Sequence, residues 1–529
     1  MTKTLDSKGL QQKRITMPNR STDTTFQLVK SLEKSEKRNF KLYVKRNSAD
    51  STLKITQLFD AMDKMEEYDE ATLLRKNQSI TKQQLSNLKA YLYRSILSSL
   101  RLIKQDDNIT IQLNEQMDFA RILYNKGLYL QTLKILDKMK ELAKQYEQIT
   151  YLQQILFFEK KIEALYITRS MQDRAEKLSK ESVAVEEQLT SVSQLSNLSL
   201  QLYSWYIKNG VARNEREGDD VKAYFESHLQ KNAEKLTGFY EQLYLYQSHC
   251  WVAFIRQDYL LYYRYTQKWV DLFEKFPAMI EAETAHYIKG MHNLMSAHFD
   301  LSNEAKLIET IDQLENFTRR KVVQQNENYR ILCFVYISIA KINKHFLEGT
   351  FTEGLRLVPH IEEKLDEYEL YLDRHRVLTF YYKIACLYFG SGNNEKAIEY
   401  LNKIINWKVD LRTDLQCYAR LLHLIAHYEL GNFDLLEYLI KSVYRFMGKM
   451  ENLSSVEEEM FKFLRHAFKL TPGKLKPAFI KLLESIRKYE GNRFETRAFV
   501  YLDVISWLES KIEEIPVQNV IHNKYKRQK

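Results

Sequence analysis

Apolar residues recur at helical spacing along almost the whole chain, from about residue 24 to residue 511. Positions i, i+3, i+4 and i+7 share one face of an α-helix, so this pattern predicts a succession of amphipathic helices. Short polar stretches interrupt it at residues 47–51, 106–108, 210–220, 320–328, 451–454 and 491–492. With ordinary helix lengths between these breaks, we expect roughly twenty helices.

Some predicted helix starts carry a sequence signature of their own. Three have the spacing of a capping box, in which two side chains three residues apart satisfy each other's backbone N–H groups. They are Thr81 with Gln84, Ser455 with Glu458, and Asn492 with Glu495. Thr471 is followed by Pro472, and proline favours the first position of a helix.

The pattern predicts a division of the chain into parts. Residues 23–105 are expected to form a separate N-terminal helical module, and residues 106–450 an array of repeated helix pairs. Residues 451–513 would cap that array, because its last apolar face has no following neighbour. The module's expected helices lie near residues 24–46, 51–65, 70–77 and 81–103. Residues 1–22 and 514–529 are basic and polar, and we expect two flexible, solvated tails there.

Residues 381–404 predict two antiparallel helices joined by a tight turn. One face of the first helix, the turn glycine and one face of the second helix are formed by Tyr381, Ile384, Ala385, Tyr388, Gly392, Ala397, Leu401 and Ile404. Ala385 and Ala397 are small, so the two helices can approach closely where these residues meet. The larger side chains would fill the space around that contact.

This unit resembles the tetratricopeptide repeat. That family's pattern has an aromatic residue, an aliphatic–small pair, a second aromatic residue, a turn glycine, and a small residue early in the second helix. The matching positions are Tyr381, Ile384, Ala385, Tyr388, Gly392, Ala397 and Leu401. The resemblance implies an all-α protein built as a right-handed α-solenoid of antiparallel helix pairs, each packed on the next.

Other stretches show the same pattern less completely. Phe119 and Ala120 are followed by Gly127, and Gly431 ends a later predicted helix. Gly392 and Gly431 are 39 residues apart, whereas the family's period is ~34 residues. We therefore expect long and irregular repeats.

Composition agrees with a helical protein and excludes several other classes. Only 14 glycines and 6 prolines occur in 529 residues, whereas a sheet-rich fold needs many such turn residues. The most apolar run, residues 331–340, is too short to span a bilayer, which takes about 20 residues. The polar N-terminus lacks the apolar centre of a secretory signal. We expect no membrane span and a cytoplasmic location.

The net charge of +10, from 79 basic and 69 acidic residues, permits an acidic or nucleic-acid partner without requiring one. The first predicted helix carries five candidate binding residues, Lys34, Lys37, Arg38, Lys41 and Lys45. Among them, Lys37, Lys41 and Lys45 recur every four residues and form a stripe. Two interpretations stay open. The stripe is either a solvated helix face or a surface that contacts phosphates or acidic groups.

Residues 239–276 are dense in aromatic side chains. Many recur at helical spacing and are expected to form core between helices. There are more of them than one buried face can hold, and an exposed remainder would offer rigid contact area to a peptide. The candidates for such binding are Tyr246, Trp251, Tyr262 and Trp269.

The sequence predicts no catalytic site, metal site or cofactor. His423 and His427 stand four residues apart, but the glutamate of a zinc protease is missing between them. Glu283 and His286 have the spacing used in di-iron bundles, which need a second such pair that the sequence lacks. The four cysteines lie far apart in apolar helical patterns, so we expect them in the core rather than in disulfides. We expect a protein that is not an enzyme.

The leading hypothesis is a scaffold that binds a peptide or helix of another protein on its helical repeats, and an acidic partner would suit the basic stripe. The alternative is a nucleic-acid-associated or transcriptional regulator, in which the basic N-terminal module contacts nucleic acid and the repeats bind a partner or act as a sensor. Residues 81–89 would then supply a recognition helix with Lys82, Gln83, Gln84, Asn87 and Lys89. The turn glycine that is frequent in helix-turn-helix motifs is missing there.

Overall fold

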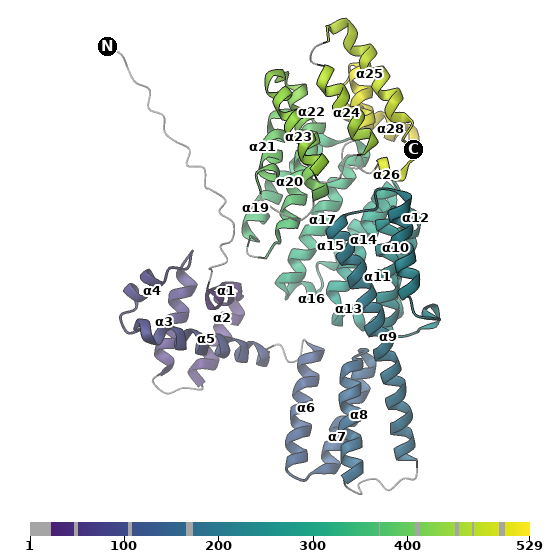
Figure 1. The fold of residues 1–529 in the computed structure, drawn as a ribbon. Coiled ribbons are helices and arrows are strands. Elements are labelled where there is room, and N and C mark those ends of the chain that lie inside the picture. The colour runs from purple at the N-terminus through teal and green to yellow at the C-terminus, as the bar shows by residue number, and fades with distance from the viewer. Residues whose placement is uncertain are drawn as a thin grey trace, which may run out of the picture. The chain divides into compact units, whose positions relative to one another are not determined.

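A computed structural model describes residues 23–46, 51–103, 108–165, 173–369, 371–407, 413–449, 454–467, 470–496 and 503–529. These residues are mostly helical, and no strand occurs among them. The helices follow one another from α1 to α28 (Figure 1). The predicted all-α class is therefore confirmed. Two compact units, residues 1–139 and residues 140–529, divide the chain.

The first unit contains six helices and most of a seventh. They are α1 (Thr24–Ser31), α2 (Lys34–Arg46), α3 (Ser51–Lys64), α4 (Glu70–Lys76), α5 (Lys82–Ile103), α6 (Ile109–Asn125) and α7 (Tyr129–Gln145). A hydrophobic core of their own joins α1 to α5, and Phe26, Phe40, Phe59 and Leu92 are buried in it. The boundary between the units falls inside α7, whereas the sequence placed the end of the module at residue 105. The polar loop at residues 106–108 shows where the chain turns, but it does not show which helices pack together into one unit.

The prediction of one helix over residues 24–46 is wrong. Leu32 adopts an extended conformation with ψ 135° and ends α1. The carboxylate of Glu36 accepts a hydrogen bond from the Glu33 N–H at 2.9 Å, and this contact caps the start of α2. The break allows Leu32, Phe40 and Val44 all to be buried in the core of the first unit.

The second unit contains the remaining helices. The first ones are α8 (Ile149–Leu165), α9 (Arg174–Asn209), α10 (Glu215–His228), α11 (Phe239–Ile255), α12 (Tyr259–Lys275), α13 (Met279–Ala282), α14 (Thr284–Asp300), α15 (Glu304–Phe317), α16 (Lys321–Gln324), α17 (Glu327–Glu348), α18 (Phe351–Gly354) and α19 (Val358–Glu367). They are followed by α20 (Arg374–Gly390), α21 (Asn394–Ile405), α22 (Thr413–Glu429), α23 (Phe433–Lys449), α24 (Ser455–Ala467), α25 (Pro472–Arg487), α26 (Arg493–Thr496), α27 (Val504–Glu513) and α28 (Val517–Gln528).

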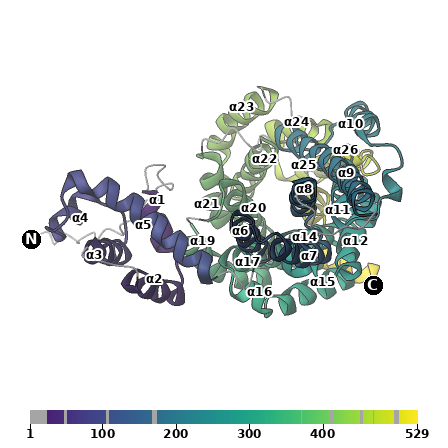
Figure 2. The same ribbon diagram turned by 90° about the horizontal axis from the view of Figure 1, so that it is seen from below.

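The helices of the second unit stack as pairs around a ring. Figure 2 shows α14, α17, α20 and α22 on the inner side and α15, α16, α21 and α23 on the outer side. Each inner helix packs on the next one, and α14, α20 and α22 each also pack on the outer helix that follows them in the chain. One continuous core, running from Val270 to Leu508, fills the space between the two layers. The predicted stack of antiparallel helix pairs is confirmed.

Two contacts between distant parts of the sequence close the ring. The guanidinium of Arg493 in α26 bonds both carboxylate oxygens of Glu215 in α10, at 3.0 and 3.2 Å. The neighbouring Phe494 packs on an apolar cluster formed by α9, α10 and α11. The last helix, α28, packs on α17, where His522 Nδ1 lies 2.7 Å from the carbonyl oxygen of Glu348. The C-terminal helices therefore join the end of the stack to two earlier parts of it, in addition to covering its last face.

The prediction of a solvated tail at residues 514–529 is wrong. Most of this segment forms α28, and Val520 is buried. Lys524 pairs with Glu509 at 2.7 Å, and Lys529 pairs with Glu304 at 2.9 Å. Basic residues that suggest solvent exposure in the sequence thus find carboxylates on neighbouring helices. The other expected tail, residues 1–22, lies outside the described residues.

Candidate protein-binding surface

The helix pair α20–α21 has the predicted close approach. Ala385 and Ala397 are fully buried, and the rings of Tyr388 and Tyr400 stack at 5.6 Å beside them. Gly392 ends the turn with φ +87°, a left-handed conformation that suits glycine. The side chain of Asn393 then accepts a hydrogen bond from the Lys396 N–H at 3.1 Å and caps α21. The sequence of this turn thus sets where both helices end.

Side chains from five helices of the second unit lie close to one another. His292 of α14 stacks on Tyr336 of α17, with ring centroids 4.0 Å apart, and Lys289 Nζ lies 5.3 Å from the centre of the same ring. The ring of Tyr203 in α9 lies 4.9 Å from that of Trp251 in α11. The sixth member is Arg376 of α20. Burial lowers the pKa of His292 and raises that of Tyr203, and the positive charge of Arg376 favours a lower pKa for both.

This set, Tyr203, Trp251, Lys289, His292, Tyr336 and Arg376, is called the inner cluster below. Along the chain, α11, α12, α14 and α17 separate α9 from α20. The interaction between Tyr203 and Arg376 therefore joins two helices that are not neighbours along the stack.

Positive charge dominates the inner cluster. Burial, together with the charges of Lys289, Arg376 and Lys383, holds the pKa of His292 well below its usual range. Arg376 pairs with Asp373 at 2.8 Å, whereas Lys289 has no ion pair within the described part of the chain. Cations without enough nearby carboxylates attract anionic groups. The inner cluster can therefore accept a carboxylate beside an aromatic surface.

Lys383 lies near the inner cluster and is itself only 3% exposed. Its Nζ donates a hydrogen bond to Asn343 Oδ1 at 2.6 Å, and the rings of Phe299 and Phe346 lie 6.0 and 5.4 Å from it. Burial lowers the pKa of Lys383 to about 7, because a low-dielectric environment disfavours the charged amine.

Comparison with known families identifies the helix pair α20–α21. Residues 378–408 match the family model of the tetratricopeptide repeat. The chain is a tetratricopeptide-like helical repeat protein. No curated protein and no solved structure matches it. The match covers the unit that carries the family's pattern in the sequence, and such repeats serve as protein–protein interaction modules.

The other signature positions of this repeat protein are structural, with one exception. Ile384, Leu401 and Ala120 are fully buried. Gly127 and Gly431 have φ +76° and +71° in the turns after α6 and α22. Phe119 departs from the prediction because it is 44% exposed. It precedes the buried Ala120 by one residue, and one residue is a rotation of about 100° around the helix.

The prediction of a peptide-binding role is wrong for two of the four aromatic residues. Tyr262 and Trp269 are 5% and 4% exposed and lie in the core with Phe239 and Phe273. Tyr246 is half-buried. Trp251, also half-buried, is the one that belongs to the inner cluster. Helical spacing alone does not distinguish the buried face of α12 from a binding face, since both are rich in aromatic residues.

The basic stripe of the first unit differs from its predicted form. Lys37 pairs with Asp63 and Lys41 with Asp60, each at 2.6 Å. Lys34, Arg38 and Lys45 are exposed, and the described residues include no ion pair for them. The stripe is therefore partly neutralised by α3, and Lys37 is turned toward that helix.

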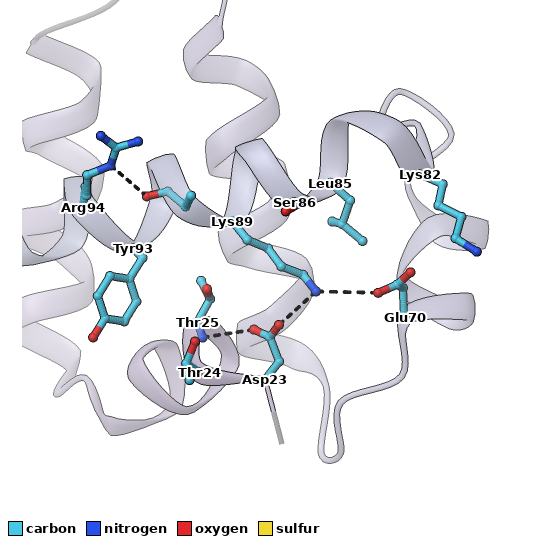
Figure 3. A pocket seen from close by; sticks show the side chains of 11 residues that line it. Asp23, Thr24, Thr25, Glu70, Lys82, Leu85, Ser86, Lys89, Tyr93 and Arg94 are labelled. Atoms are coloured by element: carbon cyan, nitrogen blue, oxygen red, sulfur yellow. Dashed lines mark hydrogen bonds and ion pairs between the residues drawn. The ribbon is translucent and has the colours of Figure 1, made fainter. Parts of the chain in front are cut away.

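A groove of about 750 Å³ runs along α5 of the first unit (Figure 3). Lys89 extends across it and pairs with Asp23 at 2.9 Å and with Glu70 at 3.7 Å. Lys89 also bonds the hydroxyl of Tyr68. This network places Lys89 in the structure of the unit itself, although the sequence offered it as part of a recognition helix. A recognition helix that used Lys89 would have to break these bonds, whereas its other four candidate residues are exposed.

The described residues contain neither a candidate membrane span nor a candidate metal-binding cluster. None of the helices there has the length and apolar character needed to cross a membrane. No three or more His, Cys, Asp or Glu side chains are grouped there in a way that could hold a metal ion. His423 Nε2 and His427 Nε2 lie 3.3 Å apart and buried. Glu283 bonds His286 at 2.8 Å.

Sequence reasoning missed most of the inner cluster. Lys289 and His292 are three residues apart on one helix, which is a weak local signal. Tyr336 and Arg376 come from other helices, and their proximity depends on how α14, α17 and α20 pack. One sequence does not reveal such a set.

Proposed function

We propose that this protein is a non-catalytic interaction scaffold whose second unit binds an acidic peptide segment of another protein at the inner cluster. The observation that carries the proposal is the excess of cations beside aromatic rings, namely Lys289 over the ring of Tyr336 and Arg376 near Tyr203. The tetratricopeptide repeat at residues 378–408 supports a protein-binding role in general.

The chemistry of the inner cluster suits an acidic peptide for two reasons. Aromatic side chains and arginine contribute disproportionately to binding energy at protein interfaces, because they bury a large area with little loss of conformational entropy. Cations in excess of the nearby carboxylates favour acidic segments over basic ones and speed their association. Because these side chains are held by packed helices, little ordering is needed when a peptide binds.

The test compares two peptides that differ only in charge. A fluorescent peptide rich in Glu and Asp, and its counterpart with Gln and Asn, are titrated with the full chain at physiological salt. We expect the acidic peptide to bind more tightly. The double variant Lys289→Gln, Arg376→Gln should weaken its binding at least tenfold, since both cations would face its carboxylates.

The matched control is Lys306→Gln, Lys396→Gln, which removes two exposed lysines from the outer helices α15 and α21. It should leave binding unchanged. The proposal is overturned if both peptides bind equally, or if the control weakens binding as much as the inner substitutions do.

A further inference from the structure

The net charge of the chain is confined to its beginning. Residues 1–105 contain 21 lysines and arginines against 11 aspartates and glutamates. Residues 106–529 contain 58 of each kind, so the whole excess of +10 lies in the first 105 residues. A moderate net charge spread over 529 residues would have little meaning, but the same charge on so short a segment produces a strong local field.

Within the first unit, four cations form a straight exposed line on α2. They are Lys34, Arg38, Lys41 and Lys45, and all four are exposed. Their spacings of four, three and four residues keep them within about 60° around the helix, and they extend about 16 Å along it. This line is called the α2 stripe below. It differs from the predicted stripe because it includes Lys34 and Arg38 and excludes Lys37.

The cations of the α2 stripe remain available to a partner. Lys41 pairs with Asp60 but is still 46% exposed at its side chain. The described residues give Lys34, Arg38 and Lys45 no ion pair. The nearby acids are engaged elsewhere: Glu36 caps α2 through the Glu33 N–H, and Asp63 accepts from Lys37.

The opposite face of α2 fixes this line in place. Phe40 and Val44 are buried in the core of the first unit. The stripe is therefore a rigid row of positive charges on a folded support, preceded in the sequence by residues 1–22 with five further cations and one acid.

We infer that the first unit binds the phosphate backbone of nucleic acid along α2, with Lys34, Arg38, Lys41 and Lys45 as the phosphate contacts. A regular row of cations matches a linear polymer with one negative charge per residue. Its lysines and arginine would contact phosphates, which position a protein but carry no base information, so binding is independent of base sequence. This site belongs to the first unit, whereas the inner cluster belongs to the second, and it does not use residues 81–89.

An anionic membrane is the less favoured ligand. A helix that lies on a membrane inserts an apolar face between the lipids. The apolar face of α2 is instead buried in the core, and Leu42 is its one large hydrophobic side chain that is exposed, among the described residues. Apart from Leu42, α2 therefore offers no large exposed apolar side chain to the acyl region.

The test measures binding of the full chain to fluorescent duplexes of random sequence, DNA and RNA, from 50 to 200 mM salt. The stripe variant carries Lys34→Gln, Arg38→Gln and Lys45→Gln. We expect it to bind at least tenfold more weakly than the wild type at 100 mM salt. The slope of log K against log salt should also shrink by about two to three, because each lost phosphate contact removes about 0.9 from it.

A matched control separates the stripe from general attraction. The variant Arg75→Gln, Lys76→Gln, Arg94→Gln removes the same charge from exposed positions on α4 and α5 of the same unit. It should keep most of the affinity. The inference fails if this control loses as much as the stripe variant, or if the wild type does not bind the duplexes. It also fails if phosphatidylserine vesicles or polyglutamate bind as tightly as the duplexes and depend equally on the stripe.

Discussion

The two units differ in where their charge lies and in how they are closed. The first unit holds a small helical core and an exposed row of cations, and its central ion pairs, those of Lys89 with Asp23 and Glu70, line an open groove. The second unit is part of a segment with equal numbers of basic and acidic residues, and it closes on itself through α26 and α28. The difference agrees with the two contacts proposed above: one through charge on the first unit, and one through cations and aromatic rings on the second.

Experiments can address each unit separately because of the tryptophans. All five, Trp205, Trp251, Trp269, Trp407 and Trp507, lie in the second unit. Tryptophan fluorescence during urea unfolding therefore reports on the second unit alone. Hydrogen exchange of peptides from α1 to α5 reports on the first.

The largest expected effect concerns the closure of the ring. Gly349 has φ +68°, and a Cβ atom there would lie 2.5 Å from the backbone nitrogen of His522 in α28. Gly349→Ala therefore adds a steric clash with α28 to the backbone strain. We expect the second unit to lose about 3 kcal/mol in the free energy of unfolding, which combines strain of about 1 kcal/mol with overpacking. Peptides from α28 should also exchange hydrogen faster.

Gly392→Ala is the matched control for this prediction. Gly392 has φ +87°, but a Cβ atom there would meet nothing within 4 Å. Its loss should be limited to the strain, about 1 kcal/mol. Equal losses for the two variants would mean that α28 contributes little to the closure, and the contrast between the units would be reduced to charge.

The second effect concerns the packing of the stack itself. Ala385→Leu and Ala397→Leu place large side chains at fully buried positions between α20 and α21. Each should lower the free energy of unfolding by about 1–3 kcal/mol, through overpacking. Tryptophan fluorescence should register the loss, while hydrogen exchange in α1 to α5 stays unchanged. Neutral behaviour of both variants would contradict the close approach at this repeat.

Local features of the fold could be predicted from the sequence, and contacts over long distances could not. Pro472 begins α25 as its position suggested. The capping box of α24 exists but lies one residue earlier, with Ser454 and Glu457 bonded to each other. Such signals depend on residues within one turn of helix, so a single sequence carries them. A one-residue error arises because Ser454 and Ser455 are both suitable caps.

The closure of the ring had no comparable signal. The basic residues of α28 predict a solvated tail, because the carboxylate that Lys529 meets, Glu304, lies 225 positions earlier in the sequence. The inner cluster likewise lacks a local sequence signal, since Tyr203 and Arg376 belong to helices that are distant in the sequence. Periodicity identifies which residues face a neighbour but does not identify that neighbour.

A third, smaller effect is a dependence of the second unit's stability on pH. The pKa of Lys383 is lowered from 10.5 to about 7 in the folded second unit. Between these values the unfolded chain binds more protons, so the free energy of unfolding should rise with pH. The expected rise from this residue is at most about 1.4 kcal/mol per pH unit. Below pH 7 the folded amine is protonated as well, and the contribution to the slope should vanish.

The measurement is urea unfolding by tryptophan fluorescence at pH 7, 8 and 9 for wild type and Lys383→Met. The difference in free energy between the two proteins isolates Lys383 from the cysteines and tyrosines that titrate in the same range. Lys341→Met, a change at a partly exposed lysine of α17, is the control and should keep the wild-type slope. An unchanged slope in Lys383→Met would mean that this amine stays charged when buried.

The smallest effect on stability is expected at the α2 stripe, where the expected effect on binding is largest. Lys34, Arg38 and Lys45 are exposed and have no ion pair among the described residues. Changing all three to Gln should alter the stability of the first unit by no more than about 0.5 kcal/mol, as is usual for surface positions. Lys89→Met provides the opposite case, because it leaves Asp23, Glu70 and Tyr68 without their shared cation. We expect faster hydrogen exchange in α1 and α5 for Lys89→Met and unchanged exchange for the stripe variant. If the stripe variant also exchanges faster, its cations stabilise the first unit, and a loss of nucleic-acid binding could no longer be assigned to phosphate contacts.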